Sequence, residues 1–261
     1  TWDYPLNFYD KFEVKGSKNA YNFTFDLRKD YDILKEIKNN KETGVIGYLL
    51  YEDGKIVIDE SDIPTYAVND VIIDGMLPSH SMGKSLVSYV TGHAICGGYI
   101  DGIDTKLNDW PMIQNTLYHN QKLIDLLNMN TGDHKIVTDV AMWNGESNDD
   151  ENLAYYMVMM KDKKGSKPKY NYHGLLPNVV FGYIKHKTGD QFEKFLEDVF
   201  QKHIKIKNSV IFFKNKNLPH DGQANSMFYA DRYDYLRIAR TIMNDYQNNN
   251  CVGKYLKNIH E

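Results

Sequence analysis

The stretch Pro78–Ile95, PSHSMGKSLVSYVTGHAI, decides how the rest of the sequence is interpreted. Its small and apolar residues are typical of a packed helix, and four of them fall on one helical face: Leu86, Val87, Val90 and Ala94. Ser81 and Lys84 stand three positions apart at the start of this helix. Side chains with that spacing lie on the same face of a helix, so the two should meet.

Two interpretations of Ser81 and Lys84 follow from their chemistry. A serine hydroxyl needs help to attack, because its pKa is too high. A desolvated lysine can serve as its base, and the N–H groups of a helix N-terminus can stabilise a developing oxyanion. The alternative is a serine that caps the helix beside a solvated lysine, and S-x-x-K arises often by chance.

The composition restricts the classes of function. The chain has 261 residues and a formal charge of −4, with 42% hydrophobic and 25% charged residues, which fits one large domain or two small ones. It has no basic patch for nucleic acid and no apolar run that could span a membrane. The opening residues TWDYPLNFYDKF lack the features of a signal peptide. Because the first residue is not Met, removal of an upstream signal and a periplasmic or secreted location stay open.

The cysteines and histidines predict neither a disulfide framework nor a metal site. Cys96 and Cys251 show no such spacing, and Cys96 is predicted to be a small buried thiol. The nine histidines include no H-x-x-x-H or H-E-x-x-H pair. We therefore expect no catalytic metal and no organic cofactor.

The pattern along the chain predicts one hairpin followed mostly by helices. Asp53-Gly54 joins strands at Val45–Tyr51 and Ile56–Asp59, after a helix within 28–40 and before a loop over 61–77. Helices are then expected at four further places: around Leu123–Leu127, over a Met-rich core segment at 148–163, over 175–204 with a break at Gly189, and over 231–247.

Residues 79–110, SHSMGKSLVSYVTGHAICGGYIDGIDTKLNDW, followed by LIDLLNMNTGDH at 123–134, resemble the serine β-lactamase and penicillin-binding-protein superfamily. The likeness is to its class C-like branch of esterases, D-amino-acid peptidases and 6-aminohexanoate-oligomer hydrolases. It extends from Gly44 to Asp245 and includes a hairpin before the S-x-x-K helix and a later helix, DRYDYLRIARTIM. The motifs are loose singly and specific in combination.

The resemblance implies a catalytic tyrosine beside the serine and lysine, which relays the proton to the leaving group. In KYNYHGLLPNVVFG, Tyr172 matches it best, with one extra residue before the helix, and Tyr170 is the alternative. A packing role also stays open, because the chain has 20 tyrosines. Gly174 stands where many β-lactamases have Asn, which favours an esterase or amidase over a β-lactamase.

The third motif of the superfamily, K-T-G on a strand, is not assigned. The sequence Lys187-Thr188-Gly189 matches the motif literally, but it follows Tyr172 at too short a distance in the chain. Its position after an apolar helical run predicts a helix end, with Gly189 as the residue that stops the helix. The motif should come after residue 240, but the sequence ends at CVGKYLKNIHE. The family's final strands, with the second oxyanion donor, are therefore expected to be absent. Either a missing segment or a partner chain completes the sheet, or the chain is a degenerate hydrolase that lost these strands. Asp133-His134 is interpreted as a solvated loop, with a position facing the cleft as the alternative, and His220–Gly222 as a loop turn.

These observations predict an α+β, β-lactamase/transpeptidase-like fold: an antiparallel sheet flanked by helices plus a helical lobe, lacking the C-terminal strands. Residues 1–261 form one domain, with the hairpin part of the α/β lobe in 1–80 and a mainly helical part in 81–245. The expected function is a serine hydrolase that acts through an acyl-enzyme on a small ester or amide. Ser81 attacks, and Lys84, neutral when desolvated, and Tyr172 move the proton. The alternative is a catalytically silent binding protein, or a fragment that needs a partner segment.

Overall fold

The computed structural model describes residues 9–63, 75–139, 153–215 and 227–260, whose strands form two sheets. The first sheet has the order β1-β6-β7-β5, and every neighbouring pair is antiparallel. Its strands are β1 (Tyr9–Val14), β5 (Leu77–Pro78), β6 (Val210–Asn215) and β7 (Phe228–Ala230). Val14 pairs with Val210, so this sheet joins the beginning of the described chain to its last third.

The second sheet contains the predicted hairpin. It has the order β2-β4-β3, formed by β2 (Thr24–Phe25), β3 (Gly47–Glu52) and β4 (Lys55–Ser61). Asp53 and Gly54 both have positive φ, 49° and 83°, as the turn between twisted antiparallel strands requires. The predicted helix before the hairpin is α1 (Tyr31–Lys38), whose first N–H groups are capped by Asp30, and the short α2 (Asn40–Thr43) follows.

The expectation that this chain supplies only a hairpin to the sheet structure is wrong. β1, β6 and β7 form a separate sheet together with β5. β5 ends a few residues before the S-x-x-K helix begins, so this sheet holds the start of the helix. The strand partners are far apart in the sequence, so no local pattern marks them. The short apolar run of β6 is ambiguous between strand and helix.

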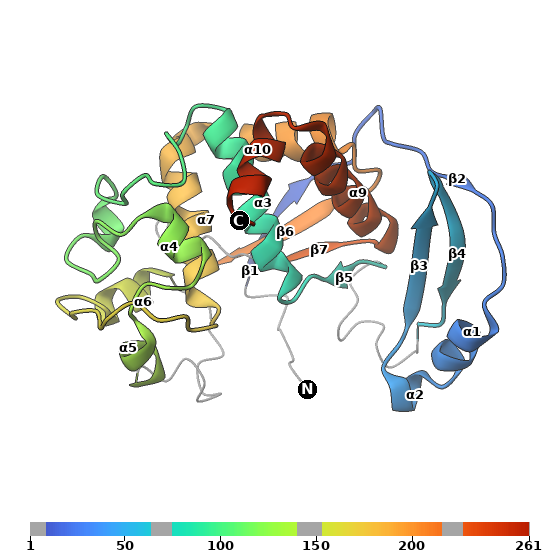
Figure 1. Ribbon diagram of the computed structural model, residues 1–261, viewed down its shortest axis with the longest axis horizontal. Coiled ribbons are helices and arrows are strands. Elements are labelled where there is room, and N and C mark those ends of the chain that lie inside the picture. Colours follow the sequence, from blue (N-terminus) through green and yellow to red (C-terminus); the bar gives the residue numbers. More distant parts are fainter. Residues whose placement is uncertain (1–8, 64–74, 140–152, 216–226, 261) are drawn as a thin grey trace.

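The S-x-x-K helix is α3 (Met82–Cys96), which ends before Gly97. α7 (Leu175–Thr188) and α10 (Cys251–Asn258) pack directly against α3, and α9 (Arg232–Asn248) packs against α10. In Figure 1 these helices lie between the hairpin sheet at one end and the helical lobe at the other. No helix among the described residues is long and apolar enough to cross a membrane.

The helical lobe is built from short helices around α7: η3 (Pro111–Ile113), α4 (Leu123–Leu127), α5 (His134–Asp139) and α6 (Leu153–Met159). The predicted break at Gly189 is confirmed, because η4 (Gly189–Gln191), α8 (Phe192–Glu197) and the π-helix η5 (Asp198–Ile204) follow α7. Met157 and Met160 of the Met-rich segment are buried, and Val158 is exposed. One connected core of buried side chains extends from Val14 through α3 and α7.

Cys96 and Cys251 form a disulfide between the end of α3 and the start of α10, with 5.9 Å between their Cα atoms. The prediction of a free buried thiol at Cys96 is therefore wrong. The two residues are 155 positions apart, and closing a loop of that length restricts the unfolded chain strongly. A disulfide of this kind contributes about 2–4 kcal/mol to stability.

Candidate active site

The junction of β5 and α3 fixes the position of Ser81. The Ser79 backbone N–H donates to the Phe228 carbonyl at 2.7 Å, and the Phe228 N–H donates to Ser79 Oγ at 3.0 Å. His80 then takes a positive φ of 43°, and Ser81 enters α3 with helical backbone angles. This turn anchors Ser81 to the first sheet, and the Ser81 side chain is exposed.

Ser81 and Lys84 contact each other, and Ser81 does not act as a helix cap. The Ser81 side chain makes no capping hydrogen bond, and Lys84 Nζ donates to Ser81 Oγ at 3.0 Å. The Lys84 side chain is half-buried. The arrangement thus differs from the capping serine and solvated lysine that chance would produce.

Tyr172 lies beside the same pair. The Lys84 ammonium is 4.8 Å from the centre of the Tyr172 ring. A hydrogen bond with Ser81, and then one with Lys84, lower the pKa of the Tyr172 phenol, because both stabilise the phenolate. Tyr170, the alternative tyrosine, is 64% exposed and contacts neither Ser81 nor Lys84 within the described ranges. The structure therefore brings Ser81, Lys84 and Tyr172 together and leaves Tyr170 outside.

A buried carboxylate holds the residue next to Tyr172. Asp133 Oδ2 accepts a hydrogen bond from Tyr118 Oη at 2.9 Å and lies 2.9 Å from His173 Nε2. The Leu175 N–H donates to His173 Nδ1, so the proton of the neutral ring is assigned to Nε2, which donates to Asp133. Burial raises the pKa of Asp133, but the hydrogen bonds from His173 and Tyr118 outweigh it, and the net shift is downward.

The interpretation of Asp133 as part of a solvated loop is wrong. Asp133 is completely buried, because Tyr118 and His173 cover it with hydrogen-bonding groups, while His134 begins α5. The turn before Asp133 also holds the segment that leads to Tyr172. The Ser166 N–H donates to the Gly132 carbonyl at 2.7 Å, and the Asn171 N–H donates to the Met129 carbonyl at 2.9 Å.

Sequence reasoning missed the buried contact between Asp133 and His173. They are 40 positions apart and match no spacing rule. The available signals were a histidine directly after Tyr172 and an aspartate directly after the NMNTG turn. Neither signal shows burial, and burial is what distinguishes these residues from loop residues.

The literal K-T-G lies at a helix end, where its sequence position indicated. Gly189 terminates α7 with a φ of 53°, and Lys187 Nζ lies 2.6 Å from Asp109 Oδ2. Lys187 is thus paired with Asp109. His220–Gly222 lies outside the described residues.

An apolar groove of about 390 Å³ lies next to Ser81, between the edge strands of the two sheets. β3 forms one wall and β5 the other, and His80, Met82 and Tyr235 line the groove between them. Within the described residues β3 pairs only with β4 and β5 only with β7. The β3 wall therefore presents backbone N–H and C=O groups that have no strand partner among the described residues, whereas Pro78 in the β5 wall has no N–H to donate.

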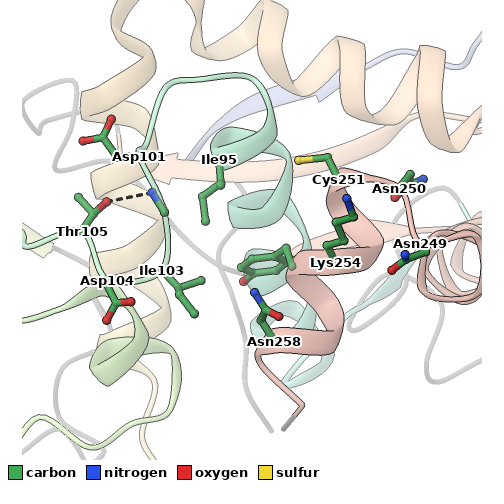
Figure 2. A pocket seen from close by; sticks show the side chains of 12 residues that line it. Ile95, Asp101, Ile103, Asp104, Thr105, Asn249, Asn250, Cys251, Lys254 and Asn258 are labelled. Carbon is green, nitrogen blue, oxygen red and sulfur yellow. Dashed lines mark hydrogen bonds between the residues drawn. The ribbon is translucent and has the colours of Figure 1, made fainter.

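A larger cleft lies at the opposite end of α3. Figure 2 shows it between the 101–105 loop and α10, where Asp101, Asp104 and Lys254 line it beside the disulfide, and its volume is about 800 Å³. Ser81 does not line this cleft. Size alone would select this cleft, whereas Ser81, Lys84 and Tyr172 meet at the other end of the helix.

Comparison with solved structures identifies the fold. A protein from Bacillus anthracis described as a 6-aminohexanoate-dimer hydrolase superimposes with a TM-score of 0.67 at 14% identity, over 94% of this chain and 69% of that one. A class C β-lactamase in complex with cefoxitin gives a TM-score of 0.52 at 11% identity, over 88% of this chain and 69% of that one. No family model and no curated protein sequence matches this chain. The chain has the serine β-lactamase-like fold, a mixed α+β architecture, and matches these structures over about 69% of their length.

Proposed function

We propose that this protein is a serine hydrolase that acts on a small ester or amide through an acyl-enzyme. The observation that carries the proposal is the contact of three groups at one helix start: Lys84 Nζ lies 3.0 Å from Ser81 Oγ and 4.8 Å from the centre of the Tyr172 ring. The fold it shares with a hydrolase and a β-lactamase supports this assignment. No metal or organic cofactor enters the proposed reaction.

The reaction proceeds in two stages. Ser81 Oγ attacks the carbonyl carbon, and its proton passes through Tyr172 and Lys84 to the leaving alcohol or amine as the C–O or C–N bond breaks. Water then attacks the Ser81 ester, and the same groups take a proton from it and return one to Ser81, which releases the acid. The lowered pKa of Tyr172 favours the phenolate that accepts the serine proton. Lys84 is only half-buried, so its contribution rests on its hydrogen bond to Ser81 rather than on full desolvation.

The Ser81 backbone N–H supplies half of the oxyanion hole in this proposal. Among the described residues it has no hydrogen-bond acceptor, so it is available to the developing charge. Further strands, from another segment of the protein or from a partner chain, are proposed to pair with the free edges of β3 and β5 and to supply the second donor. An unpaired strand edge accepts such an addition readily.

The test is the intact mass of the protein after incubation with a fluorophosphonate probe. The wild type should gain one adduct, Ser81→Ala should gain none, and Ser85→Ala, an exposed serine one turn further along α3, should label like the wild type. Hydrolysis of short-chain esters should follow the same order. A folded wild type without an adduct would overturn the hydrolase and favour the binding protein that the same scaffold can form.

A further inference from the structure

Three ligand-type side chains from three helices meet far from Ser81. His93 of α3, His203 of η5 and Asp245 of α9 each offer one ligand atom, and these atoms all lie within 4.8 Å of one another. His93 is 12 residues after Ser81 on the same helix, which places the two about 18 Å apart along the axis. This group, the His93–His203–Asp245 cluster, is therefore separate from the candidate active site.

Asp245 is the fixed centre of the cluster. Its Oδ2 lies 2.8 Å from His203 Nε2 and accepts a hydrogen bond from Tyr89 Oη at 2.5 Å. Its Oδ1 accepts from Asn250 Nδ2 at 2.7 Å. Asp245 is buried, so these partners set the direction of its carboxylate. The arrangement resembles a metal-ligating carboxylate whose orientation is fixed by its neighbours.

His93 lacks a partner that its burial demands. Its Nε2 is buried and has no hydrogen-bond partner within the part of the chain that the structure describes. Its ring packs edge-on against the rings of Tyr89 and His203, with 4.7 Å between centroids in each pair. Buried polar side-chain atoms nearly always have a partner, and an exception points to an ion or water.

An ordinary ion pair between His203 and Asp245 explains only part of this arrangement. It accounts for two of the three side chains and leaves the orientation of His93 toward them unexplained. His203 also lies on a π-helix, Asp198–Ile204, a rare geometry that is frequent at functional sites. A ligand shared by all three side chains accounts for both features.

We propose that His93, His203 and Asp245 bind one divalent transition-metal ion of the Zn²⁺ type. Two imidazoles and one carboxylate are a ligand set that Zn²⁺ accepts, with the fourth position left to water. Bonds of about 2.0–2.1 Å place tetrahedral ligands roughly 3.3 Å apart, so His93 closes toward the other two on binding. His203 is 37% exposed, which gives the ion a path from solvent.

The ion would act as a clamp between α3, η5 and α9. η5 packs against α9, and the ion would tie both elements to α3 through His93, so binding favours the folded state over the unfolded chain. The role is structural and involves no substrate. It is independent of acylation at Ser81.

The experiment uses untagged protein freed of metal with EDTA and then titrated with ZnCl₂. Isothermal titration should show one Zn²⁺ per chain, and elemental analysis after gel filtration should give the same ratio. Zn²⁺ should raise the melting temperature, and Co²⁺ in its place should give the visible absorption of a tetrahedral site. Because His203 is partly exposed, His203→Ala should fold and bind at least 10-fold more weakly, like His93→Gln, while the exposed His260→Ala should bind as the wild type.

Two results would overturn the proposal. One is the absence of stoichiometric Zn²⁺ binding by the folded wild type. The other is unchanged affinity in His203→Ala, whose fold is checked by circular dichroism without metal. Should His93→Gln fail to fold, His203→Ala alone decides. Fluorophosphonate labelling of Ser81 should be the same with and without Zn²⁺, so this test and the test of the hydrolase fail separately.

Discussion

His173 Nε2 lies 2.9 Å from Asp133 Oδ2, and both side chains are almost completely excluded from solvent. His173 follows Tyr172 directly, so the buried pair sets where the tyrosine segment enters α7. A buried carboxylate whose Oδ2 atom receives two hydrogen bonds is difficult to replace, because losing any member of this group leaves a further unpaired polar group. The exposed site thus depends on a support inside the helical lobe.

The first prediction concerns this support. Asp133→Ala should lower the free energy of unfolding by about 3 kcal/mol, because Tyr118 and His173 lose a buried acceptor. Urea denaturation followed by circular dichroism measures the change. The matched control is Asp104→Ala, which removes an exposed partner of Lys122 and should cost less than about 1 kcal/mol. Equal losses in the two variants would contradict the role of Asp133.

The second prediction concerns Gly132, which has a φ of +78°. A Cβ at this position would lie 2.2 Å from the Ser166 carbonyl oxygen, a backbone atom of the segment that leads to Tyr172. Gly132→Ala should therefore displace Tyr172 and reduce the rate of fluorophosphonate labelling at least 10-fold. Gly102→Ala, where a Cβ meets nothing within 4 Å, should label normally. Normal labelling of a folded Gly132→Ala protein would show that this turn does not position the tyrosine.

The third prediction is the pH dependence of the proposed reaction. Hydrogen bonds with Ser81 and Lys84 lower the pKa of Tyr172, so its phenolate forms below the pH at which a free tyrosine ionises. The rate of acylation should rise with pH through a step below the ordinary tyrosine pKa of about 10. Measured pH profiles of ester hydrolysis should lose this step in Tyr172→Phe and keep it in Tyr170→Phe. A step that survives in Tyr172→Phe would assign the ionisation to another group.

The fourth prediction concerns stability in the absence of metal. Burial, and then the proximity of His203, lower the pKa of His93 to about 4, although the carboxylate of Asp245 opposes this shift. The unfolded chain binds this proton more readily, so the stabilising contribution is complete above pH 6.5 and is lost as the pH falls toward 4. The loss should be about 3 kcal/mol in EDTA-treated protein, measured by urea denaturation between pH 7 and pH 4. His93→Gln should flatten this dependence, and His260→Ala should not.

Local patterns predicted the elements that local interactions determine. The Asp53-Gly54 turn and the end of α7 at Gly189 follow from the conformational preferences of two or three residues. β1 and β6 pair across about 200 positions, and neither strand shows a pattern that identifies its partner. The four-stranded sheet therefore could not be inferred from the sequence alone.

In the candidate site, too, only the residues that local structure brings together could be predicted from the sequence. Ser81 and Lys84 were predictable because a helix places residues three apart on one face. Tyr172 required the family resemblance, because nothing local distinguishes it from Tyr170. Asp133 could not be predicted, because polar residues after a turn are usually solvated and its burial is created by Tyr118 and His173.

The Cys96–Cys251 disulfide makes most of the molecule a single covalent ring. A protease that cuts once anywhere between these residues opens the ring but releases no fragment, so the nicked chain still runs as one species on a non-reducing gel. Ser81 lies outside the ring and Tyr172 lies inside it. Even after such a cut, both pieces of the proposed catalytic machinery stay tethered to each other until a reductant reaches the sulfur atoms.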